Sequence, residues 1–205
     1  MPNGRENYLM FRQKNKVLLY GIFYGILSET SMGFMPETNN AFLLLGGNLG
    51  NLLKTFARAI SAIDMQAGTV VRQSSLFESE PWEMGPAEVF MNQAVEIKTE
   101  LDPCSLLQAL LRIESDFGRI RRTSAPESRT LDIDILLFND TIYTKANLVI
   151  PHPRLHQRRF ALMPLAQIAP EKVHPVLGKS IATLLRECID TLHVAEISVK
   201  ASENN

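Results

Sequence analysis

The chain has 205 residues, of which 45% are hydrophobic and 21% are charged, and its formal net charge is −1. This length fits one domain of ordinary size with a substantial core. The charge balance excludes a globally disordered chain and a protein that coats nucleic acid. Its two cysteines, Cys104 and Cys188, supply neither a disulfide framework nor a zinc cluster, which fits a reducing compartment.

The first forty residues differ in character from the rest of the chain. Residues 1–16 are polar and basic, and residues 17–27 form an apolar run. This is the layout of a secretory signal, although Ser-Glu-Thr-Ser at 28–31 makes a poor cleavage site. A start artefact or disordered extension, a targeting or membrane segment, and additional structure remain open, and the first is our expectation for residues 1–40. No apolar run reaches the roughly 18 residues that span a membrane, and we expect a cytoplasmic protein with no membrane contact by its domain.

Residues 41–190 are predicted to form the domain, and residues 191–205 a C-terminal tail. Residues 51–66 are typical of an amphipathic helix, because apolar side chains recur there every three or four positions. Asp102 followed by Pro103 predicts a helix start, with an N-cap and a proline in the first turn. Strands are predicted at residues 41–45, 69–77, 91–99, 131–138 and 141–143 (a return strand), and helices at 51–66, from 102 onward, 160–168 and 181–189.

The order strand, helix, strand, strand, helix, strand decides the predicted fold class. It indicates an α+β protein, a ferredoxin-like βαββαβ sandwich with C-terminal helical additions. We expect the helices to cover one face of the sheet and to leave the other face free.

Two acids, Asp132 and Asp134, alternate with apolar residues at 131, 133, 135 and 137. Both carboxylates therefore share one strand face, with their Cα atoms about 7 Å apart. Like charges this close need a cation between them, and Mg²⁺ binds both carboxylate and phosphate oxygens. Two ions about 3.5–4 Å apart would fit between such carboxylates and a phosphate chain. Taken alone, the pattern also fits a strand whose solvent-exposed face carries two acidic residues by chance.

Arginines flank the acidic strand on both sides in the sequence. They are Arg119, Arg121, Arg122 and Arg129 before it, and Arg154, Arg158 and Arg159 after it. A guanidinium binds phosphate oxygens in a fork and keeps its charge at every physiological pH. Acids and arginines together favour a metal–polyphosphate site over a merely solvated basic loop.

Phe90 and Phe160 follow loops on either side of this region, and Asn92 shares a strand face with Phe90. Aromatic planes and an amide suit a flat heterocycle, because stacking supplies contact area and the amide reads the edge of the ring. Each phenylalanine by itself is more typical of a core.

Three motifs in this order resemble the 6-hydroxymethyl-7,8-dihydropterin pyrophosphokinase family. They are Gly-Gly-Asn-Leu-Gly at 46–50, Arg-Thr-Leu-Asp-Ile-Asp-Ile at 129–135 and Ile-Pro-His-Pro at 150–153. The similarity covers about residues 41–190. It implies a ferredoxin-like fold and transfer of diphosphate from ATP to the pterin hydroxymethyl group in folate biosynthesis, with AMP as the other product. We expect ATP as co-substrate, two Mg²⁺ ions, a monomer, and no nucleic-acid partner.

The resemblance also implies residue roles, position by position. Asp132 and Asp134 match the magnesium-binding aspartates, and Arg119 and Arg129 match arginines that act on the phosphates. Nucleotide contacts are implied for Glu114, Arg121, His152 and Arg158. Pterin contacts are implied for Ser79, Trp82, Phe90, Asn92 and Phe160.

Three places depart from the family pattern. Residues 125–128 read Ala-Pro-Glu-Ser where glycine-proline usually precedes the arginine, Pro153 stands where an aromatic residue is common, and Gly47 stands where serine is usual. We expect these changes to affect ATP affinity rather than the metal aspartates.

Two other functions use similar parts. A two-metal nucleotidyltransferase needs a broad basic surface, whereas this chain has local arginine clusters. An RNA-binding sheet of RRM type needs exposed aromatics on its central strands, where Asp132 and Asp134 instead place negative charge. The motifs favour the pyrophosphokinase.

Overall fold

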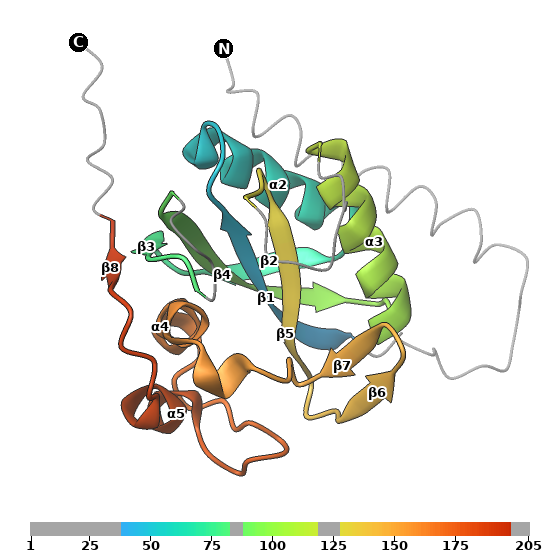
Figure 1. Cartoon of the computed structure of the whole chain (residues 1–205). Coiled ribbons are helices and arrows are strands. Elements are labelled where there is room, and N and C mark those ends of the chain that lie inside the picture. The colour runs from blue at the N-terminus through green and yellow to red at the C-terminus, as the bar shows by residue number, and fades with distance from the viewer. Residues whose placement is uncertain (1–37, 83–87, 119–127, 198–205) are drawn as a thin grey trace, which may run out of the picture. The chain divides into compact units, whose positions relative to one another are not determined.

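The computed structural model describes residues 38–82, 88–118 and 128–197, and every structural statement here concerns these ranges. The expectations for residues 1–37, 119–127 and 198–205, which include Arg119, Arg121 and Arg122, lie outside them. The elements, shown in Figure 1, are in chain order β1 (Asn39–Gly47), α2 (Leu52–Gln66), β2 (Thr69–Gln73), β3 (Phe77–Ser79), β4 (Phe90–Thr99), α3 (Pro103–Asp116), β5 (Asp132–Phe138), β6 (Tyr143–Lys145), β7 (Leu148–Ile150), the short 3₁₀ helix η1 (Leu155–Gln157), α4 (Arg159–Ile168), α5 (Ile181–Glu187) and β8 (Val194–Glu196).

The main sheet is antiparallel, and β1 lies between β4 and β5. The strand order is β5-β1-β4-β3-β8, and β2 also pairs with β4. β2 and β3 can be counted as two halves of one strand. The strands in chain order are then β1, β2 with β3, β4 and β5, and β1 lies between β4 and β5, as in a split βαβ fold. The predicted ferredoxin-like fold is therefore confirmed.

Local sequence signals set the ends of both helices in the first half of the chain. Asn51 is the N-cap of α2, and its Oδ1 accepts a hydrogen bond from the backbone N of Lys54 at 3.0 Å. Asp102 is the N-cap of α3, and Pro103 occupies the first turn, as predicted. Caps of this kind each stabilise a helix by about 1 kcal/mol.

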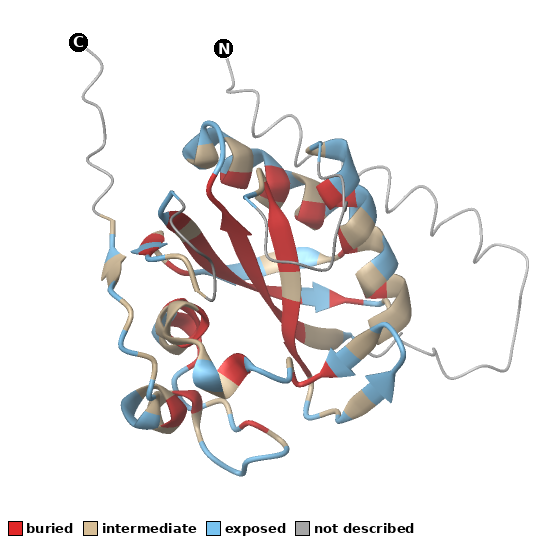
Figure 2. Cartoon of the chain, in the orientation of Figure 1, coloured by how far each residue is buried: buried red, intermediate tan, exposed pale blue. Residues whose placement is uncertain are grey.

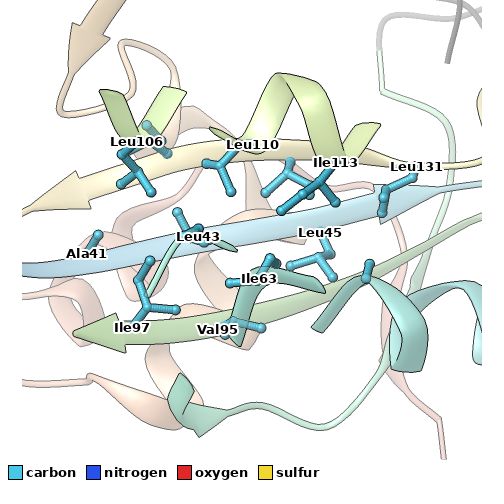
Figure 3. Close-up of a cluster of buried hydrophobic side chains, with 14 of the residues drawn as sticks. Ala41, Leu43, Leu45, Ile63, Val95, Ile97, Leu106, Leu110, Ile113 and Leu131 are labelled. Carbon is cyan, nitrogen blue, oxygen red and sulfur yellow. The ribbon is translucent and has the colours of Figure 1, made fainter. Parts of the chain in front are cut away.

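The first hydrophobic core lies between α2, α3 and one face of the sheet. Figure 3 shows side chains of β1, β4 and β5 meeting those of the two helices, among them Leu43, Val95 and Ile63. These three side chains have no exposed surface. In Figure 2 the buried residues follow β1 and β5 along most of their length, whereas the outer sides of α2 and α3 are exposed.

The other face of the sheet is also covered, so the expectation of a free face was wrong. A second core joins Phe42, Leu44 and Ala94 of the sheet to α4 and α5. Leu162 and Leu165 of α4 are fully buried in it. The sequence had identified both late helices, but their apolar sides need a surface, and the second sheet face supplies it.

A bulge in β5 overturns part of the predicted alternation. Leu43 pairs with Ile135 and Phe42 pairs with Leu137, which leaves Leu136 as an extra residue. Leu137 consequently lies in the second core instead of sharing a face with Ile133. The bulge follows both aspartates, so their common face is unaffected.

The strand predicted at residues 69–77 is divided into β2 and β3. Ser74 interrupts it: the Ser74 side-chain Oγ accepts the hydrogen bond from the backbone N of Ala94 at 3.0 Å. A side-chain oxygen thus takes a position that a strand carbonyl normally fills. The return strand predicted at 141–143 was also wrong in its bounds, because β6 begins at Tyr143. This strand pairs with β7 and not with β5.

Two further features complete the described fold. β8, which the sequence did not predict, pairs antiparallel with β3. Among the helices within residues 38–82, 88–118 and 128–197, none is both long enough and apolar enough to cross a bilayer.

Candidate active site

A row of three residues crosses β5, β1 and β4 near one end of these strands, on the sheet face that carries α4. In the strand register Gly46 of β1 lies opposite Asp132 of β5 on one side and opposite Asn92 of β4 on the other. Apart from its chain neighbours, the one heavy atom of the described residues within 4 Å of a Cβ atom added at Gly46 would be Asn92 Oδ1, at 3.5 Å. The missing side chain therefore leaves space between the aspartate and the asparagine.

Both aspartates of the predicted metal pair are on this face and have arginine partners. Arg129 Nη2 lies 2.9 Å from Asp132 Oδ2, and Arg158 Nη1 lies 3.8 Å from Asp134 Oδ2. The Asp132 side chain is 13% exposed and that of Asp134 36% exposed. The carboxylates thus sit at the border of the core, in reach of both the protein's cations and a ligand.

The same arginines also contact the predicted stacking aromatics. The Arg129 guanidinium lies 5.3 Å from the centre of the Phe90 ring, and that of Arg158 lies 5.6 Å from the centre of the Phe160 ring. These distances are typical of cation–π contacts. The predicted phosphate side and the predicted heterocycle side of the site are therefore adjacent in the fold.

Trp82 extends the aromatic side toward a further arginine. Its ring lies 6.4 Å from that of Phe160, and the guanidinium groups of Arg158 and Arg154 lie 4.7 and 4.9 Å from its centre. The sequence had named Arg154 as part of a cluster but not as a site residue. Its stacking on Trp82 brings it to the site.

Asn92 presents its side-chain carbonyl to the space above Gly46. Its Nδ2 donates to Ser79 Oγ at 2.9 Å, and both residues are buried. Because the nitrogen is engaged by the serine, the oxygen is the atom that faces Gly46. The site therefore offers an acceptor to an N–H group of a flat ligand.

His152 is held at the open edge of β5, beside Asp134. Its backbone N donates to Leu136 O at 2.9 Å, and its ring Nε2 lies 3.3 Å from Arg158 Nη1. Burial lowers the pKa of His152, and the charges of Arg158 and Arg154 lower it further, while Asp134 opposes them. Burial therefore favours the neutral form of the ring.

Glu114 reaches β5 from α3, which packs on the sheet face opposite the aspartates. Glu114 is 2% exposed, and its Oε1 accepts a hydrogen bond from the backbone N of Ile133 at 2.8 Å. β5 is an edge strand of the main sheet, and an edge N–H needs such an acceptor. A nucleotide contact by Glu114 stays a prediction.

Asn48 is a residue of the site that the sequence analysis did not single out. It is 4% exposed, and its Oδ1 accepts a hydrogen bond from the backbone N of Arg129 at 2.8 Å. Nearby, a Cβ atom on Gly47 would lie 2.7 Å from Thr130 O. A side chain at position 47 would therefore require the Thr130 backbone to shift.

Comparison with known proteins decides the family. Residues 42–170 match the family model described as 7,8-dihydro-6-hydroxymethylpterin-pyrophosphokinase (HPPK). The chain belongs to this family. The resemblance inferred from the three motifs is thereby confirmed.

Individual HPPK relatives agree with this assignment. The chain is 40% identical over 156 residues to 2-amino-4-hydroxy-6-hydroxymethyldihydropteridine pyrophosphokinase of Synechocystis, with 75% of this chain and 78% of the relative covered. The protein of that name from Bacillus subtilis is 40% identical over 131 residues, covering 63% and 78%.

A solved structure supports the fold. Wild-type Plasmodium falciparum HPPK-DHPS with STZ-DHP superposes with a TM-score of 0.61 at 19% identity, over 76% of this chain and 44% of that chain. This chain thus spans less than half of that longer protein, and at this identity the likeness concerns the fold alone.

The donor set for a metal is small. In the described parts of the chain no three side chains of His, Cys, Asp or Glu gather as a metal-binding group. Asp132 and Asp134 nevertheless fit Mg²⁺, since that ion keeps several waters and binds through one or two carboxylates together with substrate phosphates.

Proposed function

We propose that this chain transfers diphosphate from ATP to 6-hydroxymethyl-7,8-dihydropterin, giving AMP and the pterin diphosphate. As a member of the HPPK family it is an ATP-dependent diphosphotransferase of folate biosynthesis. The observation that carries the proposal is the adjacency of two aspartate–arginine pairs to Phe90, Asn92 and Phe160 on one sheet face. This face offers charged groups for a phosphate chain beside aromatic and amide groups for a flat heterocycle.

The pterin is assigned to the space above Gly46. Phe90 and Phe160 would supply the stacking surfaces, and Asn92 Oδ1 would accept a hydrogen bond from a ring N–H. Ser79 would hold the Asn92 amide in that orientation through its 2.9 Å contact with Nδ2. Trp82, packed on Phe160, would close the pterin side.

The nucleotide phosphates are assigned to the arginine side. Arg129 and Arg158 would turn from the carboxylates toward the phosphate oxygens and neutralise the charge that develops during transfer. His152, whose pKa is lowered by burial, would contact the nucleotide. Arg119, Arg121 and Glu114 complete the nucleotide contacts that family membership suggests.

Asp132 and Asp134 are assigned to Mg²⁺, for which two ions are expected. When bound, Mg²⁺ would neutralise phosphate charge and hold the reacting oxygens in position. In the reaction itself the pterin hydroxymethyl oxygen bonds to the β-phosphorus, the bond from that phosphorus to the α-phosphate oxygen breaks, and AMP leaves. The hydroxyl proton is released. Positioning and charge neutralisation supply most of the rate.

A product assay tests the proposal. The full chain is incubated with ATP and Mg²⁺, with and without 6-hydroxymethyl-7,8-dihydropterin, and the nucleotide products are separated. Pterin-dependent AMP is the expected product, and ADP or no product rejects the function. A monomer, a cytoplasmic location and the lack of a nucleic-acid partner stay predictions from the sequence.

A further inference from the structure

Asn48 is a buried polar residue in the turn between β1 and α2. It is 4% exposed, and its side chain bonds to segments that lie 40 and 80 or more positions away in the sequence. A buried amide that satisfies itself across such separations fixes the relative placement of the segments it joins.

The Asn48 carbonyl oxygen holds the backbone of Arg129. Oδ1 accepts from the Arg129 N–H at 2.8 Å, and the backbone N of Asn48 donates to Arg129 O at 2.9 Å. One residue thus binds both backbone polar groups of the arginine. The Arg129 guanidinium starts from this fixed backbone when it contacts Asp132 and Phe90.

The Asn48 amide nitrogen reaches both sides of the site. Nδ2 donates to Ser128 Oγ at 3.0 Å and to Glu88 O at 3.4 Å. Ser128 precedes Arg129, and Glu88 lies two residues before Phe90 at the start of β4. The partners also fix which amide atom is oxygen, because Arg129 N–H can only donate and Glu88 C=O can only accept.

We propose that Asn48 is a positioning residue that fixes the distance between the Arg129 backbone and the segment leading into Phe90. The phosphate side and the pterin side of the site are then assembled as a unit. Asn48 acts through Arg129 and Phe90, and this role rests on the proposed function. A loss of such positioning by about 1 Å lowers turnover by about 100-fold.

Three variants separate positioning from stability. Asn48→Ala removes the side-chain bonds to Arg129 N, Ser128 Oγ and Glu88 O, and it leaves the backbone bond from Asn48 N to Arg129 O. Asn48→Asp keeps an acceptor for the Arg129 N–H but turns a second oxygen toward Glu88 O, so only the pterin-side link is lost. Asn139→Ala is the matched control, because Asn139 joins β1 and β5 at the ends opposite to Asn48. Asn139 Oδ1 accepts from Asn40 N at 2.7 Å, and Nδ2 donates to Asn39 Oδ1 at 2.8 Å.

The readouts are kcat, the KM for each substrate, and Trp82 fluorescence, since Trp82 is the chain's one tryptophan. The fluorescence probe is oxidised 6-hydroxymethylpterin, titrated without nucleotide. Asn48→Ala is expected to lose about 100-fold in kcat. Asn48→Asp is expected to raise the KM for the pterin about tenfold and to weaken the fluorescence response, with the KM for ATP unchanged. Asn139→Ala is expected to lower only the unfolding midpoint.

Each result decides one question. If the unmodified chain makes no pterin-dependent AMP, the proposed function fails. If it is active but both Asn48 variants match Asn139→Ala in kcat and both KM values, the positioning role is overturned. If Asn48→Ala does not fold, Asn48→Asp decides, and an unchanged pterin KM in that variant overturns the role.

Discussion

Arg129 and Asp132 form an ion pair with 2.9 Å between Nη2 and Oδ2, while the same guanidinium lies 5.3 Å from the centre of the Phe90 ring. One side chain therefore joins the carboxylate assigned to the metal and the ring assigned to the pterin. Arg158 repeats this relationship with Asp134 and Phe160 at 3.8 and 5.6 Å. Each carboxylate of the pair thus has a cation beside it before any ligand arrives, which offsets the repulsion between the two acids.

Asp132→Asn tests the assigned metal pair. The substitution keeps the size of the side chain but removes the charge that Mg²⁺ would need, so kcat should fall by about 100-fold or more, equivalent to several kcal/mol of transition-state stabilisation. Steady-state AMP formation measures it.

The matched control for this substitution is Asp140→Asn. Asp140 also pairs with a cation, Lys172 at 2.7 Å, but its side chain is 82% exposed and outside the site. The control should keep normal turnover. Equal activity of the two variants would refute the assignment of Asp132.

Ser79→Ala tests how the pterin is read. Without Ser79 Oγ, the buried Asn92 Nδ2 loses its 2.9 Å acceptor and the amide is free to turn. A lost hydrogen bond of this kind costs about 1 kcal/mol, so the KM for the pterin should rise about fivefold to tenfold. The KM for ATP should not change.

Ser74→Ala is the matched control for Ser79→Ala. Ser74 is also buried, and its hydroxyl likewise bonds to β4, accepting from Ala94 N at 3.0 Å. The free energy of unfolding of Ser74→Ala, from urea titrations, should fall about as much as that of Ser79→Ala. Neither KM should change. A similar rise of the pterin KM in both variants would count against a specific role of Ser79.

The sequence predicted the acidic face of β5 correctly because strand alternation is a local property. Asp132 and Asp134 needed only period two to share a face. The bulge at Leu136 could not be predicted, since Leu136 and Leu137 are equally apolar and fit either core. Likewise, Ser74 divides its strand through a contact with Ala94, twenty positions away in the sequence.

Asn48 was missed for a related reason. Its turn read as a glycine-rich connection, and nothing local shows that the amide will be buried against Arg129 and Glu88. The available signal was a polar residue directly after a strand whose last seven residues, 41–47, are apolar or glycine, at a position where the strand leads into a helix. Such a residue is exposed in most turns, and only the tertiary contacts distinguish this case.

His174 makes the stability depend on pH. It is 4% exposed, its Nδ1 accepts from Leu177 N at 3.3 Å, and within the described chain its buried Nε2 has no hydrogen-bond partner. Burial lowers the pKa of His174, and the nearby His156 lowers it further. The unfolded chain binds a proton at this position with a pKa near 6.5, whereas the folded chain binds it only at lower pH, so stability falls as the pH drops below about 6.5.

His174→Asn isolates this contribution. The asparagine oxygen can still accept from Leu177 N, but the side chain does not titrate. The free energy of unfolding from urea titrations should therefore fall less between about pH 7 and pH 5 in the variant than in the unmodified chain. His152, whose pKa is also lowered, contributes equally to both proteins. Parallel pH profiles would exclude a contribution from His174.

Replacement by alanine should lower stability at Gly47 but change it little at Gly46. At Gly47 a Cβ atom would lie 2.7 Å from Thr130 O, which is backbone and cannot turn aside. Gly47→Ala should lower the free energy of unfolding by about 1–3 kcal/mol, as overpacking does. At Gly46 the added Cβ would make an ordinary 3.5 Å contact with Asn92 Oδ1, so Gly46→Ala should change stability by less than about 1 kcal/mol.

Activity should rank the two glycine variants in the reverse order, measured where both are folded. The Gly46→Ala methyl group would lie beside the oxygen assigned to read the pterin, in the space between Asp132 and Asn92. We expect a KM for the pterin raised about tenfold or more, with the KM for ATP unchanged. The folded fraction of Gly47→Ala should keep a KM for the pterin closer to normal. A Gly46→Ala protein with normal pterin affinity would place the heterocycle elsewhere on the sheet.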